Sequence, residues 1–370
     1  MIQVHIDGSR RPRPPAQRIV FCDGATEGAL GAGDLELSHW IPNRTPARWK
    51  ADTSTEICLN HVADRAAEAA EAARGEAAER YDLAVNNHVD VDGVLSLWVL
   101  AHGEAALAHR RTLVQTAEIG DFHGWGEPAA QALYEALVHA MQQGTRESLD
   151  ANDVVERCFA RIDAVLAGAP VPEAAPGLAA MAAALARLQS GEVVRHLRGE
   201  RLVHYSVPAA LAEADLAQAL AVARFNVSLA EASLVPPQAR AQGDGGRDGQ
   251  RLQLLSYETR TGWYHDLWLP GYAWAETPHR WRPPGLGDGG DSNVHRYANA
   301  PLDTAARDLG RDERHPGRWA VATTLTPFKA LPERAFPIVL SFLREGRPEP
   351  SSLSADVVGA RLEAAFADLR

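Results

Sequence analysis

The sequence of 370 residues lacks an apolar run long enough to cross a bilayer. Its longest apolar stretches, such as residues 94–101, fall far short of the ~20 residues that a membrane-spanning helix requires. The amino-terminal residues also lack the apolar core of an export signal, and Arg10-Arg-Pro-Arg-Pro-Pro15 follows within them. We therefore expect a cytoplasmic protein that has no membrane partner.

Cysteine is scarce as well. The chain has three cysteines, Cys22, Cys58 and Cys158, which are scattered, and none belongs to a Cys-x-x-Cys pair. Disulfide frameworks in secreted proteins need an even set of cysteines in an oxidising compartment. We expect reduced thiols, in agreement with a cytosolic location.

Basic blocks and two common catalytic motifs are also missing. The net charge is −11, and no run of Lys and Arg offsets it, which argues against a long nucleic acid as partner. There is no Walker A loop and no Gly-x-Ser-x-Gly elbow, so P-loop and α/β-hydrolase chemistry are not expected. A phosphorylated small molecule or a short oligonucleotide remains possible as partner, because a bound metal can supply local positive charge.

What is present favours an α/β protein. Residues 18–22, 35–41 and 83–85 have the composition of buried strands, and a helix is expected from about residue 53 to about residue 80. From Val94 the apolar pattern is again helical. Residues 1–125 are therefore predicted to form an α/β domain, with a partly parallel sheet and helices on both faces.

The rest of the chain differs in composition. Residues 126–195 are rich in alanine and predict a helical continuation of the first domain. Residues 196–370 predict an α+β domain, with strands at 201–207, 251–257, 262–269 and 318–325. This part is rich in tryptophan and holds five of the nine in the chain: Trp263, Trp268, Trp274, Trp281 and Trp319.

The most informative segment is residues 81–96, where the predicted strand 83–85 is followed by His88, Asp90 and Asp92 and then by a helix. Open α/β sheets place ligands at the carboxyl ends of their strands. Two carboxylates with a neighbouring histidine suit a divalent cation. This segment therefore predicts a metal site.

Three other interpretations of this segment were weighed. An EF-hand loop that starts at His88 would need Glu at position 12, which is Val99. The segment 90–95 resembles the signature of haloacid-dehalogenase-type phosphatases, which implies Asp90 as nucleophile and Asp92 as the proton-transfer group. One aspartate capping the next helix would instead make the turn purely structural.

In order and spacing, Asn86-Asn-His-Val-Asp-Val-Asp-Gly-Val-Leu-Ser96 most closely resembles motif I of the DHH-type phosphoesterases. This resemblance implies a pair of Mn²⁺ or Mg²⁺ ions held by Asp90 and Asp92, with Asp92 as bridge. Many members have a histidine ligand where this chain has Asn86, so either His88 takes over that role or one metal is lost, and Asn86 is expected to contact substrate. Two such metals suit phosphodiester or pyrophosphate hydrolysis.

The Asp-His-His motif that gives the superfamily its name does not occur in this chain. Asp121 and His123 are the nearest substitute, and we expect them to complete the metal site. Thr53 and Ser54 start a predicted helix, whose free N–H groups suit a substrate phosphate, although a capping box from Thr53 to Glu56 explains them equally. His39 and Arg44 follow the preceding strand and are further substrate-binding candidates.

The leading hypothesis is a divalent-metal-dependent phosphoester hydrolase acting on a phosphodiester, a pyrophosphate or a small phosphorylated metabolite. Its expected metal ligands are Asp90, Asp92, Asp121 and His123, and Asp92 and His88 are its expected catalytic residues. The missing Asp-His-His motif motivates the competing hypothesis, a non-catalytic binding protein on the same fold. The sequence predicts no particular oligomeric state.

Overall fold

The computed structural model confirms the α/β class and divides the chain into two compact units. It describes residues 2–26, 30–71, 81–211, 234–279, 281–286, 294–326, 330–331, 334 and 337–367. The first unit comprises Met1–Phe122, Gly126–Ala175 and Ala275–Arg280. The second comprises His123–Trp125, Pro176–Trp274 and Trp281–Arg370.

The first unit is built on a four-stranded sheet with the order β1-β4-β2-β3, in which every described pair is parallel. Its strands are apolar and mostly buried, as strands of a covered parallel sheet are. They are β1 (Gln3–Ile6), β2 (Ile19–Cys22), β3 (Leu35–Leu37) and β4 (Leu83–Asn86). The sequence prediction omitted β1 and made β3 four residues too long at its carboxyl end.

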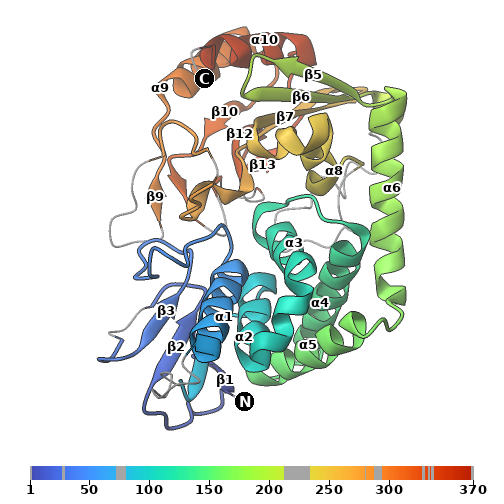
Figure 1. Ribbon diagram of the computed structural model, residues 1–370. Coiled ribbons are helices and arrows are strands. Elements are labelled where there is room, and N and C mark those ends of the chain that lie inside the picture. Colours follow the sequence, from blue (N-terminus) through green and yellow to red (C-terminus); the bar gives the residue numbers. More distant parts are fainter. Residues whose placement is uncertain are drawn as a thin grey trace. The chain divides into compact units, whose positions relative to one another are not determined.

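Helices pack beside this sheet (Figure 1). The helix α1 (Ser54–Glu71) begins where the capping pattern predicts, because Thr53 Oγ1 accepts the Glu56 N–H at 3.2 Å. Residues 72–80, where this helix was expected to continue, lie outside the described part. The remaining elements are α2 (Val91–His102), η1 (Gly103–His109), α3 (Arg110–Phe122), α4 (Pro128–Arg146), α5 (Ala151–Leu166) and η2 (Pro172–Ala174).

One stretch, Val91–Phe122, is long and apolar enough to cross a membrane by length and composition. It comprises α2, η1 and α3, and 56% of its most apolar window is buried inside the protein. This burial is that of a core helix in a soluble globular protein.

The second unit contains a seven-stranded sheet with the order β10-β12-β8-β7-β6-β5 and with β13 paired to β12. All its pairs are antiparallel except β6 with β7. Its strands are β5 (Val194–Arg198), β6 (Leu202–Val207), β7 (Leu252–Thr259), β8 (Gly262–Trp268), β10 (Arg318–Val321), β12 (Ile338–Arg344) and β13 (Arg347–Pro348). A separate pair joins β9 (His295–Arg296) to β11 (Thr324–Leu325).

The second unit also contains helices. They are α6 (Ala175–Ser190), α8 (Pro237–Ala241), η4 (Gly243–Gln250), η5 (Gly271–Trp274), α9 (Ala300–Asp312) and α10 (Ala355–Ala365). Helices α9 and α10 lie side by side (Figure 1). The aromatic residues expected in this half lie largely in the core, and Trp268, Trp274 and Tyr272 are all buried.

Candidate metal centre

The parallel sheet of the first unit brings the residues that follow three strands to one edge. Asp23 follows β2, His39 lies two residues beyond β3, and His88 lies two residues beyond β4. The carboxyl ends of parallel strands meet at the same edge of a sheet. Residues 65 positions apart, such as Asp23 and His88, therefore become neighbours, with 3.1 Å between Asp23 Oδ2 and His88 Nε2.

Two groups of possible ligands form at this edge, and Asp23 belongs to both. One group is Asp23, His88 and Asp90, and the other is Asp23, His39 and Asp92. In each group the ligand atoms lie within 4.8 Å of one another. Asp23 Oδ1 lies 3.5 Å from His39 Nε2, whereas its Oδ2 faces His88. Asp23 thus presents one oxygen to each group.

Asp90 combines a structural role with a place in the first group. Its Oδ1 accepts the Gly93 N–H at 2.8 Å and so caps α2, as the structural interpretation of the turn expected. Its Oδ2 lies 3.0 Å from His88 Nε2. The aspartate therefore caps the helix with one oxygen and faces the cluster with the other.

Asp92 is held by the first turn of α1. Its Oδ2 accepts the Ser54 N–H at 2.7 Å, and its Oδ1 accepts the Thr55 N–H at 2.8 Å. Free N–H groups at a helix start attract an anion, and here that anion belongs to the protein itself. Thr53 and Ser54 were expected to bind a substrate phosphate. Instead Thr53 caps α1, and Ser54 Oγ donates to Asp23 Oδ1 at 2.9 Å.

Both histidines present Nε2 to the carboxylates because hydrogen bonds fix their other nitrogens. His39 Nδ1 donates to the Asp52 carbonyl oxygen at 2.7 Å, since a carbonyl can only accept. His88 Nδ1 lies 2.9 Å from Asn87 Oδ1. Such a bond at one ring nitrogen is the usual support of a metal-ligating histidine.

Asp121, an expected metal ligand, lies beside His39 at the end of α3. Its Oδ2 lies 3.2 Å from His39 Nε2, and the residue is buried. His39 was expected to contact substrate, but it lies among the carboxylates, and its side chain has no exposed surface. Its Nε2 is 3.6 Å from Asp92 Oδ2.

The pKa values in the cluster are shifted because four buried carboxylates lie around two imidazoles. Burial alone would lower the pKa of His39, but Asp121, Asp92 and Asp23 outweigh it and raise this pKa to about 10. Burial would raise the pKa of Asp23, yet His88 and His39 bring it down to about 2. The carboxylates thus favour positive charge on the neighbouring imidazoles.

Two other buried carboxylates of the cluster, Asp92 and Asp121, show the opposite pKa shift to Asp23. Burial and the charge of Asp23 raise the pKa of Asp92 to about 6. Burial, followed by the charge of Asp92, raises the pKa of Asp121 well above its usual value. Like charges in a dry site oppose one another's ionisation, and a cation would relieve both.

Asn86 and Gly93 shape the turn beneath the cluster. Asn86 is fully buried, and its Oδ1 accepts the Asn87 N–H at 2.6 Å. A Cβ on Gly93 would lie 2.1 Å from Asn86 Nδ2, 3.0 Å from Asp90 Oδ1 and 3.1 Å from Asp23 Oδ2. Only glycine allows the three polar side chains to come this close to the start of α2.

Six predicted site residues are in neither ligand group: Asn86, Thr53, Ser54 and Asp121, whose contacts are given above, and His123 and Arg44. His123 belongs to the second unit, where its ring lies edge-on to Trp268 with 6.1 Å between centroids. Its positive φ of 53° turns the chain directly after α3. Arg44 lies beside Glu36, and 62% of its side chain is exposed.

Asp23 is the residue that sequence reasoning missed. The available signal was the Asp23-Gly24 pair at the end of a predicted strand, and Asp23 adopts a positive φ of 58° there. An Asp-Gly pair is also an ordinary turn. Its partners lie up to 69 positions away in the chain, and only the strand order β4-β2 makes them neighbours.

Comparison with known proteins gives a family but no activity. No curated protein and no solved structure matches the chain. Residues 10–235, more than half of the chain, match the profile described as "Family of unknown function (DUF6687)", and they include every residue of the metal-binding candidate cluster. The chain belongs to this family.

Proposed function

We propose that this chain is a cytoplasmic phosphoester hydrolase that depends on divalent metal ions held by Asp23, His39, His88, Asp90 and Asp92. The observation that carries the proposal is that Asp23 serves two ligand groups, one through each carboxylate oxygen. A shared carboxylate is what a pair of closely spaced cations requires, and such pairs recur in phosphatases and nucleases.

The donor atoms fit Mn²⁺ or Mg²⁺. Carboxylates are preferred by both ions, and the two imidazoles favour Mn²⁺ over Mg²⁺. Buried polar atoms at the centre support a cation: Asp23 Oδ2 and both oxygens of Asp121 accept no hydrogen bond within the described residues. Asp121 is placed to serve as a further ligand or to orient His39.

The resemblance to the DHH-type phosphoesterases supports the same chemistry. The segment that carries it, residues 86–96, supplies His88, Asp90 and Asp92 to the cluster. When bound, the metal pair would polarise a phosphoryl oxygen and stabilise the leaving oxygen. The protein's own part is to hold the carboxylates: Ser54 and Thr55 fix Asp92, and Gly93 fixes Asp90.

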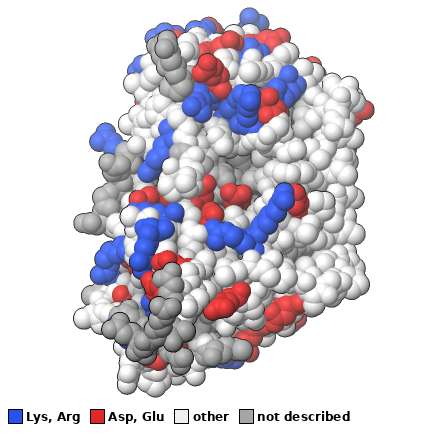
Figure 2. Space-filling view, viewed as in Figure 1, with Lys and Arg blue, Asp and Glu red and all other residues white. Residues whose placement is uncertain are grey.

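The exposure of the cluster and the charge of the protein restrict the class of substrate that can bind. His88 is the most exposed member of the cluster, with 20% of its side chain exposed, so a phosphoryl group would approach from the His88 side. Acidic and basic side chains are interspersed on the face in Figure 2, and much of that face is uncharged. Together with the net charge of −11, this favours a small phosphorylated molecule, a pyrophosphate or a short oligonucleotide.

A non-catalytic protein on the same fold is the second candidate. The observation that favours it is that Asp90 and Asp92 already make backbone hydrogen bonds that fix α1 and α2. Protonated His39 and His88 could then balance the carboxylates without a metal. Metal binding separates the two candidates.

The test is a calorimetric titration of Mn²⁺ and Mg²⁺ into the purified chain and into an Asp90→Asn/Asp92→Asn double variant. Hydrolysis of bis(p-nitrophenyl) phosphate and of pyrophosphate is measured in parallel. Glu36→Gln is the matched control, because Glu36 is also a buried acid of the first unit but belongs to neither ligand group.

We expect saturable Mn²⁺ binding and metal-dependent hydrolysis in the wild type and the control, and the loss of both in the double variant. Equal and negligible metal binding by all three proteins would refute the proposal. That outcome would favour the non-catalytic candidate, whereas metal binding without turnover of any phosphoester would refute the hydrolase activity.

A further inference from the structure

The second unit contains a buried arginine without a carboxylate partner. Arg240 on α8 has no exposed surface. Its Nε donates to Gln253 Oε1 at 2.7 Å, and its Nη1 donates to the Val235 carbonyl oxygen at 2.6 Å. Its Nη2 makes no hydrogen bond, and the described residues form no ion pair with it. Both N–H bonds of Nη2 are therefore unused within the described part of the chain.

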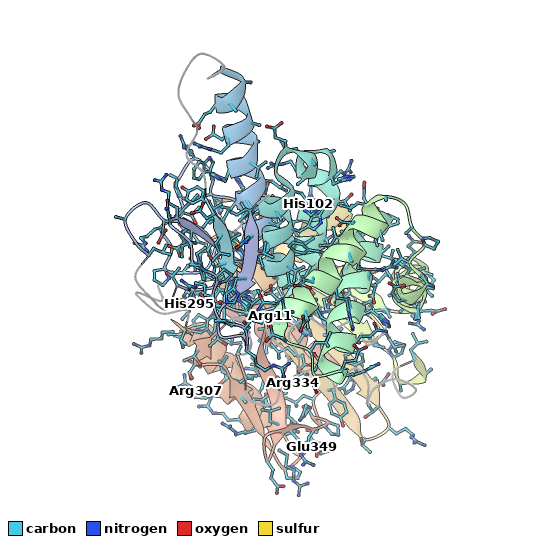
Figure 3. The ribbon with its side chains drawn as sticks, turned by 90° about the horizontal axis from the view of Figure 1, so that it is seen from below. Arg11, His102, His295, Arg307, Arg334 and Glu349 are labelled. Carbon is cyan, nitrogen blue, oxygen red and sulfur yellow. The ribbon has the colours of Figure 1, made fainter. Side chains whose placement is uncertain are left out.

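A second buried arginine has a similar surplus of donors. Arg334, labelled in Figure 3, lies between β11 and β12 and is 3% exposed. Its Nη2 contacts Asp266 Oδ2, whereas Nε and Nη1 make no hydrogen bond. Asp266 is already shared, because its Oδ1 accepts from Ser341 Oγ at 2.8 Å.

The two guanidinium groups lie on one face of the seven-stranded sheet. Arg334 contacts Asp266, and the Arg240 Cζ atom lies 4.6 Å from the centre of the Trp268 ring. Asp266 and Trp268 are two positions apart on β8, so their side chains point to the same face. The charge of Asp266 also acts on Arg240 and opposes the lowering of its pKa by burial.

The charges on this face do not balance. Among the described residues, Arg240 and Arg334 carry two positive charges there, and Asp266 supplies one negative charge. The neighbouring Asp248 is occupied, because it pairs with Arg195 and Arg251 and accepts the Tyr205 hydroxyl. A buried charge without a partner is strongly unfavourable, and so is a buried donor without an acceptor.

We propose that Arg240 and Arg334 form a binding site for a phosphate group, supplied by inorganic phosphate or by a phosphate monoester. Three guanidinium nitrogens make no hydrogen bond, and together they carry five N–H bonds: two on Arg240 Nη2, one on Arg334 Nε and two on Arg334 Nη1. A phosphate offers at least three oxygens to these donors, and guanidinium forks bind such groups in a bidentate manner. A carboxylate has only two oxygens and satisfies this donor set less fully.

This site goes beyond the proposed metal centre and rests on none of its residues. The indole N–H of Trp268 is also buried without a hydrogen-bond partner, so it adds a donor next to Arg240. The Arg240 guanidinium lies over this ring, so Trp268 contributes its N–H to the site and not a free ring face.

The test is equilibrium binding of radiolabelled inorganic phosphate to the full chain in the presence of EDTA, with phenyl phosphate, sulfate and acetate as competitors. Arg334→Gln removes the guanidinium and its charge. Arg334→Lys keeps the positive charge but lacks the planar guanidinium that donates two parallel hydrogen bonds. Arg307→Gln is the control, because Arg307 belongs to the same unit but is exposed on α9. The Asp90→Asn/Asp92→Asn variant tests independence from the metal centre.

We expect saturable phosphate binding that phenyl phosphate displaces more readily than acetate does. Affinity should fall at least tenfold in Arg334→Gln and less in Arg334→Lys, and it should be unchanged in Arg307→Gln and in the double aspartate variant. Phosphate should also raise the Tm of the wild type more than that of Arg334→Lys. The proposal is overturned by absent binding in the wild type, by equal affinity in Arg334→Gln and Arg307→Gln, or by binding that is lost only in the aspartate variant.

Discussion

His39 Nε2 and Asp121 Oδ2 lie 3.2 Å apart, although one residue follows a strand of the sheet and the other ends a helix 82 positions later. The opposite nitrogen of His39 donates to the Asp52 carbonyl oxygen, so the ring cannot turn away without losing that bond. The imidazole is thereby directed at Asp121, Asp92 and Asp23. This orientation makes His39 a structural link between the sheet edge and α3.

Gly93→Ala should reduce Mn²⁺ affinity more than tenfold and lower the free energy of unfolding by about 1–3 kcal/mol, the usual cost of overpacking. The new Cβ would lie 2.1 Å from Asn86 Nδ2 and 3.0 Å from Asp90 Oδ1, so these groups would have to move. Calorimetric titration and urea unfolding measure the two effects.

Gly310→Ala provides the control for this substitution. Gly310 lies inside α9, and a Cβ there would meet nothing within 4 Å. Alanine should therefore stabilise the protein by about 0.5–1 kcal/mol through helix propensity and leave metal affinity unchanged. Similar metal affinities in the two alanine variants would contradict the crowding argument.

The stability of the second unit should decrease as the pH is lowered from 7 to 5. Within a hydrogen-bonded chain, Arg198 Nε donates to His204 Nδ1, His204 Nε2 to Ser256 Oγ, Ser256 to His265 Nδ1, and His265 Nε2 to the Leu353 carbonyl oxygen. Each histidine is neutral in this pattern. Burial lowers the pKa of His204 to about 3 and that of His265 to about 4.

The unfolded chain has histidines of ordinary pKa 6.5, so between pH 6.5 and pH 4 it binds more protons than the folded chain. Stability is therefore fully present above pH 6.5 and is lost as the pH falls, by about 2 kcal/mol for each histidine at pH 5. Urea unfolding at pH 7 and pH 5 should show a smaller loss in His265→Gln than in the wild type. An equal loss in both proteins would argue against this origin of the pH dependence.

Asp248→Asn should destabilise the protein by about 3–5 kcal/mol, the usual cost of breaking a buried charged network. Asp248 is fully buried and accepts bonds from Arg195, Arg251 and Tyr205, whereas an asparagine would direct an amide N–H at one of these donors. Asp308→Asn is the comparison, because Asp308 forms a partly exposed pair with Arg311 and should change stability by less than about 1 kcal/mol. Thermal unfolding of both variants gives the difference, and comparable losses would contradict the assignment.

The sequence was sufficient to predict the strand–turn–helix segment and its place at a sheet edge. Hydrophobic run length identified β2 and β4, and the two carboxylates after β4 marked the edge. The sequence was not sufficient to predict which distant residues meet Asp90 and Asp92. That depends on strand order, and β4 inserts between β1 and β2, which is not encoded in any local pattern.

The roles of single residues depended on the same long-range contacts. The start of α1 was predicted as an anion site, but the anion that it holds is Asp92, from 37 or 38 positions further along the chain. His123 was expected near Asp121 from spacing alone, yet the chain turns at its positive φ into the second unit. Local patterns predicted the donors and acceptors, and the pairing among them came from tertiary structure.

The central claim is that Asp23 serves two metal sites. It is tested most directly by an electron paramagnetic resonance titration of Mn²⁺ into the wild type, Asp23→Asn and the control Glu36→Gln. We expect tight binding of two Mn²⁺ ions per chain in the wild type and in the control, and loss of both ions in Asp23→Asn. Undiminished Mn²⁺ binding by Asp23→Asn, or no saturable binding by the wild type, would contradict it.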